Sequence, residues 1–526
     1  MDEICRKWSI HGCSAVIVQQ DLAGRWSEQI LTYGQRNAEG DQVDADTRFF
    51  IASNSKLFCV LATGIALEEA GYPKGFKTRI KDVVAAYRLQ DLFLTETVTF
   101  EDAFAHLTGL PRHDIYTTND ASTLEDQLRL LGGMKASLGI REATQYHNPH
   151  YDLIALIVEK ITGQDYPSYV RKKILEPLGM ASTSVLVSSM LESSNFAKGH
   201  WHHYETLESP GQSIELPMGL RDGKSACLGA GRMSSTAQDM GVWLKTLLGD
   251  GQHPQSGAPV IPSGMIKRCR RGTVRFDEYI LEHPGFGPAL YGLGLWEQPY
   301  YGHTLVQHVG ALSGWMSRLV LIPESKLGIF VVTNNAPWGG LACDEITMEI
   351  VDRHIGLPKS DWTSRLLADK ENVLRTWTSQ LRATLKAASE ETTSDGVPMD
   401  RSMITGTYTA PGFHKFTIKA EHILSHPPKS LWDLPWFPQI WCKEFQPLLW
   451  PGTSPHKYKM CFKCSFPEQM EHEDMLGLPC DVELLVEGGK VLGMGLRGCW
   501  GAGKGVPCPE GLNVRDRAEV FLDKIG

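Results

Sequence analysis

The sequence predicts an α+β fold over residues 1–360, with an antiparallel sheet, flanking helices and a helical subdomain, and then a small β-barrel-like domain over 400–526. Three observations favour this fold. Segments with the alternation of β-strands stand at both ends of the first region, and its middle carries helical spacing. After residue 400 the segments are short, aromatic and separated by Pro and Gly turns. Residues 361–399 are predicted to form a charged amphipathic helix and a polar linker.

The strands of the first region are predicted at its two ends. Residues 14–20 (SAVIVQQ) and 28–33 (EQILTY) flank a polar turn, which is typical of a hairpin. Residues 303–334 contain three apolar segments that are split by Gly and Pro turns. Because strands joined by short turns pair antiparallel, we expect both groups in one antiparallel sheet.

Three helices are predicted between these strands. Residues 151–161 (YDLIALIVEKI) have apolar residues at helical spacing and are followed by Gly163, a typical C-terminal cap. A helix over 236–248 is expected to take its N-terminal cap from Ser234–Ser235. A largely buried helix is expected to begin at Lys56, since apolar side chains follow it at helical spacing.

Composition favours a soluble globular enzyme. The 526 residues are 42% hydrophobic and 21% charged, and the net charge is -9 without a block of like charge. Nothing therefore favours nucleic acid or an anionic membrane as a partner. The sequence has no apolar run of about 18 residues, the length that a spanning helix needs. The 12 cysteines are scattered and the N-terminus lacks an apolar leader, so free thiols and a cytoplasmic location are expected.

Ser53 and Lys56 place a hydroxyl and an amine three residues apart at the start of the buried helix. Residues at this spacing lie on one helix face, about 5–6 Å apart at Cβ. A hydroxyl is a weak nucleophile that needs a neighbouring base. A lysine that is buried among apolar side chains loses its proton more easily, because desolvation disfavours the ammonium. The pair is therefore a candidate nucleophile and base.

The S-x-x-K pattern is weak when it stands alone. Ser454 and Lys457 share it within a proline-rich segment where no helix can run. An alternative interpretation of Ser53 is a helix N-cap with a solvated lysine one turn later, since Ser is a favoured N-cap. Tyr146 has a similar alternative interpretation as a core tyrosine whose hydroxyl is hydrogen-bonded within the protein.

Two further motifs follow the pair in chain order. Tyr146 and Asn148 (YHN) precede the 151–161 helix, and His308 and Gly310 (HVG) open an apolar strand pair. The trio S-x-x-K, Y-x-N and [K/H]-x-G resembles the class C β-lactamase and D-alanyl-D-alanine peptidase superfamily, which includes serine esterases and acyltransferases. The sequence around the motifs also resembles that superfamily, over roughly two-thirds of the chain.

The resemblance implies a role for each of these residues. Ser53 would form the acyl-enzyme, while Lys56 and Tyr146 would share the proton transfers, without a decision as to which is the base. Asn148 would form hydrogen bonds near the lysine and the substrate. The backbone N–H groups of Ser53 and Ala311 would form the oxyanion hole, where each donor typically contributes about 3–4 kcal/mol. No cofactor is implied.

His308 departs from the typical β-lactamase pattern, in which lysine stands at this position. A neutral or partly charged histidine would hold a substrate carboxylate less firmly, which favours ester or thioester chemistry over antibiotic degradation. The implied function is a serine hydrolase that acts on an ester, thioester or amide of a small molecule, or on a carrier-bound thioester. The alternatives are an acyltransferase or transesterase of secondary metabolism with the same residues, and a non-catalytic scaffold.

Other segments carry weaker signals. Residues 200–204 (HWHHY) contain three histidines, but without a carboxylate at ligand-like spacing a substrate-wall role outweighs metal binding. Cys461 and Cys464 form a lone C-x-x-C without the second pair that a zinc site needs. The aromatic stretch over 430–452 suggests either a lid on the active site or, with more weight, core packing.

Overall fold

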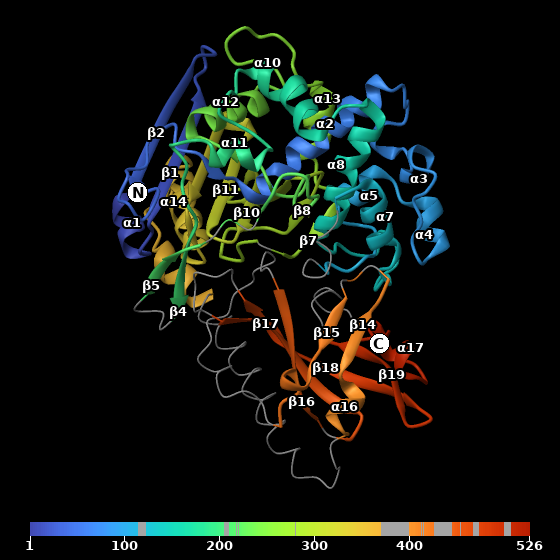
Figure 1. Ribbon diagram of the computed structural model, residues 1–526. Helices are drawn as coiled ribbons and strands as arrows, with labels where there is room; N and C mark the ends of the chain where they lie inside the picture. Colours follow the sequence, from blue (N-terminus) through green and yellow to red (C-terminus); the bar gives the residue numbers. More distant parts are fainter. Residues whose placement is uncertain are drawn as a thin grey trace.

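The computed structural model describes residues 1–113, 122–204, 210–216, 218, 220–278, 280–369, 399–411, 413, 415–425, 444–452, 454–465, 473–498 and 507–525. The chain forms a large α+β domain and a smaller β domain beneath it in the view of Figure 1. Both parts of the predicted fold class are therefore confirmed. The exact domain boundaries stay a prediction, because residues 370–398 lie outside the described residues.

An antiparallel sheet of eight strands is the centre of the large domain, in the order β2-β1-β12-β11-β10-β9-β8-β7. The strands are β1 (Gly12–Gln20), β2 (Trp26–Gly34), β7 (Val274–Phe276), β8 (Ala289–Tyr291), β9 (Trp296–Tyr300), β10 (His303–Leu312), β11 (Trp315–Ile322) and β12 (Leu327–Thr333). The N-terminal hairpin joins the later strands because β1 pairs with β12, from Cys13 opposite Thr333 to Gln19 opposite Leu327. The predicted union of the two terminal groups of strands is confirmed.

Helices cover both faces of this sheet. α12 (Ala237–Leu248) contacts β1 and β12, and α14 (Trp338–His354) contacts β11 and β12. This double cover explains why β12 (LGIFVVT) is apolar throughout: every residue of the strand is buried.

Two buried helices form the middle of the helical part, beside the sheet (Figure 1). α2 (Ser55–Glu69) packs on α8 (Asn148–Thr162), which ends at Gly163 in the left-handed conformation, as predicted. The predicted cap of α12 is wrong by one residue. Its N-cap is Thr236, which accepts the Asp239 N–H, whereas Ser234–Ser235 form a short strand that pairs with Phe49–Phe50.

The remaining elements of the large domain are short. They are α1 (Asp2–Lys7), α3 (Ile80–Val83), α4 (Leu92–Thr97), α5 (Phe100–Phe104), α7 (Leu124–Gly132), α9 (Tyr166–Val170), α10 (Glu176–Leu178), α11 (Val187–Leu191), α13 (Ser263–Arg270), β3 (Phe49–Phe50), β4 (His200–Tyr204), β5 (Pro210–Glu215), β6 (Ser234–Ser235) and β13 (Asn335–Ala336). None of the helices in the described ranges is long and apolar enough to cross a membrane.

The C-terminal domain is a seven-stranded antiparallel sheet that nearly closes into a barrel, in the order β15-β14-β20-β19-β18-β17-β16. Its elements are α16 (Arg401–Ile404), β14 (Gly406–Thr409), β15 (Phe416–Ile418), β16 (Glu444–Pro451), β17 (Lys457–Ser465), β18 (Glu473–Glu487), β19 (Lys490–Arg497), α17 (Val514–Arg517) and β20 (Val520–Lys524). The two end strands, β15 and β16, contact each other. The domain has its own apolar core, which includes Tyr408, Leu449, Met494 and Leu522.

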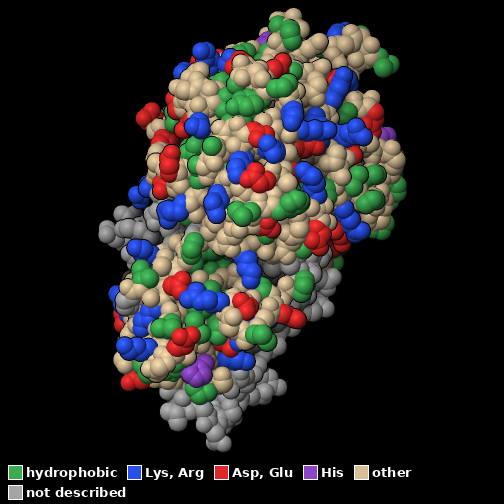
Figure 2. All heavy atoms as spheres, turned by 90° about the vertical axis from the view of Figure 1, so that its right-hand side faces the viewer, with side chains coloured by type: hydrophobic (Ala, Val, Ile, Leu, Met, Phe, Trp, Pro, Cys, Tyr) green, Lys and Arg blue, Asp and Glu red, His purple; other side chains and the backbone are tan. Residues whose placement is uncertain are grey.

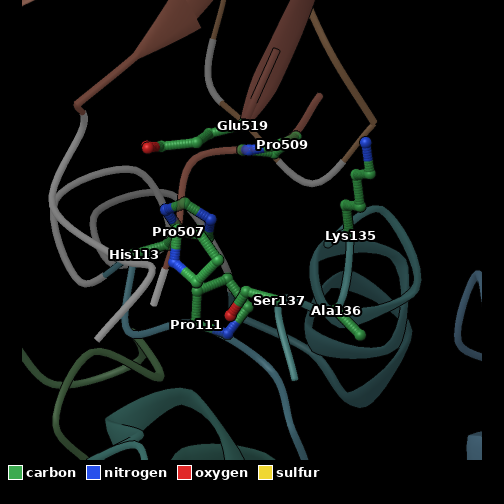
Figure 3. A pocket seen from close by; sticks show the side chains of 8 residues that line it. All are labelled: Pro111, His113, Lys135, Ala136, Ser137, Pro507, Pro509 and Glu519. Atoms are coloured by element: carbon green, nitrogen blue, oxygen red, sulfur yellow. The ribbon is translucent and has the colours of Figure 1, made fainter. Parts of the chain in front are cut away.

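Residues 430–443 of the aromatic stretch predicted as lid or core lie outside the described residues, and most of its remainder forms β16. Within the described part of the chain, the two domains meet near the end of the Leu110–His113 segment. The His113 ring packs edge-on against Phe413, with 5.3 Å between the ring centroids. Beside this contact lies a cavity of about 180 Å³, lined by residues of both domains including Pro111, Lys135 and Glu519 (Figure 3).

The surface carries both signs of charge. On the face shown in Figure 2, Lys and Arg side chains are interspersed with Asp and Glu over both domains. This pattern agrees with the even charge distribution in the sequence.

Candidate active site

Ser53 lies in a tight 3₁₀ turn, Ala52–Asn54, directly before α2. Ala52 has a φ of 49°, a conformation that costs a non-glycine residue about 1–3 kcal/mol. The Ser55 hydroxyl holds the strained turn, because it donates to the Ala52 carbonyl (2.6 Å) and accepts the Met233 N–H (3.1 Å). Asn54 occupies the N-cap position of α2, so Ser53 does not have the capping role of the alternative interpretation.

Strands β10 and β11 hold the other side of the Ala52–Asn54 turn. The Ser317 hydroxyl donates to the Ile51 carbonyl and accepts from the Asn54 side chain, both at 2.8 Å. Gly310 packs so closely that a Cβ there would lie 2.4 Å from the Ile51 oxygen. The glycine of the third motif is therefore required by the close approach of β10 to the turn that carries Ser53.

Lys56 is fully buried on α2, and its amine lies between two oxygens. Nζ is 3.0 Å from Ser53 Oγ and 2.7 Å from the Ala230 carbonyl oxygen. The two side chains meet as the helical spacing predicts. The second S-x-x-K match does not form such a pair, because Lys457 is exposed at the start of β17.

Tyr146 lies beside the Ser53–Lys56 pair. Its side chain is 4% exposed, and the Lys56 amine lies 4.8 Å from the centre of its ring. The Arg112 guanidinium lies 5.2 Å from the same ring, within the range of a cation–π contact. Asn148 is half-buried at the first position of α8.

His308 of the third motif is buried behind Tyr146, with their ring centres 6.3 Å apart. Its Nδ1 lies 2.6 Å from the Val309 carbonyl, which can only accept, so Nδ1 carries the ring proton. Nε2 then accepts from the Tyr291 hydroxyl at 3.0 Å. Burial, with a smaller effect of the Lys56 charge, lowers the pKa of His308 to about 3. The imidazole is neutral at physiological pH and both its nitrogens are used within the protein.

The hydrogen-bonded chain continues to a residue that the sequence analysis did not single out. His106 Nε2 donates to the Tyr291 hydroxyl (3.3 Å), and His106 Nδ1 accepts the backbone N–H of His147 (3.0 Å). Burial also holds the pKa of His106 well below its usual range. The chain links the loop before α8 to β10, so it fixes the second and third motifs relative to each other.

The structure also describes the positions of Ala311, His200 and Cys461. Ala311 follows Gly310 in β10 with its side chain exposed. His200 is buried in β4, where its ring stacks on His11 at 3.7 Å. Cys461 is a buried free thiol in β17. Over the described residues there is no group of three or more His, Cys, Asp or Glu side chains that could hold a metal ion.

Known proteins resemble the chain in sequence and in fold. Residues 23–349 match the family model described as Beta-lactamase. Two fungal relatives are each 25% identical: the unguisins hydrolase of Aspergillus campestris, over 78% of this chain and 75% of its own, and that of Aspergillus violaceofuscus, over 69% and 65%. The octameric penicillin-binding protein homologue of Pyrococcus abyssi covers 94% of this chain and 96% of its own at 20% identity, with a TM-score of 0.57. This structural likeness supports the fold alone.

The free energy of unfolding should depend on pH, because His308 stays neutral in the folded protein. The folded pKa of His308 lies below the unfolded value of about 6.5, so its contribution is present above pH 6.5 and is lost as the pH falls. The free energy of unfolding of the wild type should fall between pH 6 and pH 4, partly because His308 binds a proton when the protein unfolds. In His308→Gln this fall should be smaller by about 1.4 kcal/mol per pH unit, the value for one proton. Urea titrations at each pH measure this slope. The exposed His456→Gln serves as the control for the loss of a surface imidazole. A slope in His308→Gln equal to that of the wild type would contradict a neutral His308.

Gly310→Ala tests the close approach of β10 to the turn that carries Ser53. The Cβ of Gly310→Ala would overlap the Ile51 carbonyl, so the variant should lose about 1–3 kcal/mol of stability and displace the Ala52–Asn54 turn. Gly340→Ala in α14 is the matched control, because its Cβ would meet nothing closer than Met316 Cγ at 3.9 Å. Denaturant titration and the rate of Ser53 acylation by an activated ester test both effects. A Gly310→Ala protein as active and stable as Gly340→Ala would refute the close-approach argument.

Proposed function

The chain belongs to the beta-lactamase family of hydrolases, and we propose that it cleaves an ester, thioester or amide of a small molecule through an acyl-enzyme on Ser53. One observation carries this proposal: the buried Lys56 amine lies 3.0 Å from Ser53 Oγ. A serine hydroxyl becomes an effective nucleophile only beside a group that can take its proton. A binding scaffold would have no use for this contact.

The reaction has two steps. Ser53 Oγ attacks the substrate carbonyl carbon while its proton passes to the Lys56–Tyr146 pair, and the tetrahedral intermediate expels the leaving group, which takes up that proton. Water then attacks the Ser53 ester, gives its proton to the same pair, and the acid is released as the serine regains its hydrogen. Backbone N–H groups of Ser53 and Ala311 would stabilise the oxyanion in both steps. Asn148 would orient the substrate beside the lysine.

The substrate class follows from His308 and from the relatives. A neutral His308, with both nitrogens bonded inside the protein, offers no permanent charge to a substrate carboxylate. This favours acyl groups that do not depend on a carboxylate anchor at that position. The two Aspergillus relatives are named unguisins hydrolases, which supports a secondary metabolite as the substrate and water as the acceptor.

The nucleophile is tested by Ser53→Ala. The variant should lose hydrolysis of p-nitrophenyl esters by about 10³-fold or more, because no other group replaces the hydroxyl. Its unfolding free energy should stay within about 1 kcal/mol of wild type, since a single hydroxyl at a turn is removed. Ser454→Ala, in the second S-x-x-K match, should retain full activity. Retention of activity in Ser53→Ala, or its loss in Ser454→Ala, would overturn the assignment.

Tyr146→Phe separates proton transfer from packing. Loss of the phenol oxygen should slow turnover by about 10²–10⁴-fold, the usual contribution of a general acid–base group. Burst kinetics with a p-nitrophenyl ester would show whether acylation, deacylation or both are slowed. Tyr301→Phe, at a half-exposed tyrosine outside the site, is the matched control. An unchanged kcat in Tyr146→Phe would place Tyr146 among the core residues.

A further inference from the structure

Asp152 is a buried carboxylate behind the reacting side chains, and the steps above do not use it. It lies on α8 and is 2% exposed. Its Oδ1 accepts the backbone N–H groups of Gly229 and Ala230, and its Oδ2 accepts that of Cys227, each at 3.0 Å. Three donors on one carboxylate show that the turn over 227–230 is built around this charge.

The turn that Asp152 holds is strained and tightly packed. Cys227 has a φ of 54°, in the left-handed region that a residue with a Cβ rarely adopts. Gly229 lies directly on α8, and a Cβ there would be 2.2 Å from the Tyr151 carbonyl oxygen. Strained backbone persists only where its surroundings determine it. The bonds to Asp152 supply that determination from the α8 side.

The same turn presents an acceptor to the catalytic lysine. The Ala230 carbonyl accepts from Lys56 Nζ at 2.7 Å, while the Ala230 N–H donates to Asp152. Asp152 and Lys56 are therefore linked through one residue. The link extends to Ser53, whose Oγ is the other oxygen bonded to Nζ.

We propose that Asp152 is a positioning residue of the acyl-transfer reaction: it holds the 227–230 turn so that the Ala230 carbonyl keeps the Lys56 amine on Ser53 Oγ. This inference rests on the function proposed above. A displacement of a reacting group by about 1 Å can cost about 10²-fold in rate, so a rigid acceptor for the amine is a large advantage. Asp152 does not touch the substrate or the reacting atoms.

Because Asp152 can gain a proton, the hydrogen bonds that hold the 227–230 turn should depend on pH. The groups that face it are Lys56 and Cys59 on α2, Tyr166 on α9 and Arg232 after the turn. Burial raises the pKa of Asp152 to about 7, against the opposing effect of the three N–H donors and of Lys56. The carboxylate form, which accepts from all three N–H groups, therefore predominates above about pH 7 and is lost as the pH falls through that value.

Asp152→Asn tests the proposal, because an amide keeps the shape but removes the charge and turns one acceptor into a donor facing an N–H. The probe is labelling of Ser53 by a fluorophosphonate, followed by peptide mass spectrometry from pH 6 to pH 9. Above pH 8 the variant should label about 10- to 100-fold more slowly than wild type. As the pH falls below about 7 and Asp152 of the wild type gains a proton, the two rates should converge.

Asp239→Asn is the matched control. Asp239 is also a buried carboxylate, on α12, and it accepts from the Ser182 N–H and the Thr183 hydroxyl without contact to Lys56. Its loss should lower stability without a pH-dependent effect on labelling. If Asp152→Asn does not fold, the comparison is made in a Cys227→Gly background, since glycine adopts a positive φ without strain.

The outcomes separate the two proposals. Absence of Ser53 labelling in the wild-type protein would refute the proposed function itself. Wild-type labelling with an Asp152→Asn rate that equals wild type, or that is reduced by the same factor at every pH, would refute the positioning role while leaving the function intact.

Discussion

The contact between the Lys56 amine and Ser53 Oγ is the interaction on which the rest of the site depends. The buried amine of Lys56 lies between two oxygens, so its position depends on rigid neighbours. Several neighbouring elements hold these two oxygens in place. α2 supplies the spacing, β10 and β11 hold the strained turn, and the 227–230 turn supplies the second oxygen. Because the interior is close-packed, a shift in any of these elements would be transmitted to the amine.

Two neutral imidazoles, His106 and His308, lie near this buried amine. Burial removes the charge of His106 and His308, and hydrogen bonds through Tyr291 use their ring nitrogens. A charged imidazole beside Lys56 would add repulsion in a medium of low dielectric constant. His308, where the family usually has lysine, thus belongs to a series of hydrogen bonds that joins the second and third motifs. These bonds explain how the site keeps its geometry without a cation at that position.

The sequence predicts those features that depend on local spacing. Ser53 and Lys56 meet because three residues make nearly one helical turn, and the hairpins of both sheets follow from alternation between turns. The hydrogen bonds from His106 to His308 cannot be predicted, because they join segments about 200 residues apart and His106 alone resembles an ordinary polar residue. Asp152 carried a signal that was overlooked: it is the single acidic residue within the apolar run YDLIALIV. The cap of α12 was misplaced because Ser234, Ser235 and Thr236 are all good caps, and only the strand pairing of the two serines decides between them.

Lys56→Met tests whether the buried amine of Lys56 activates Ser53. Methionine fills a similar volume without a basic group, and Lys457→Met alters the exposed lysine of the second S-x-x-K match as a control. Fluorophosphonate labelling with peptide mapping should give one adduct, on Ser53, at equal rates in wild type and Lys457→Met and at least about 10²-fold more slowly in Lys56→Met. An adduct on another residue would show that Ser53 is not the nucleophile, and an undiminished rate on Ser53 in Lys56→Met would show that the amine does not activate it.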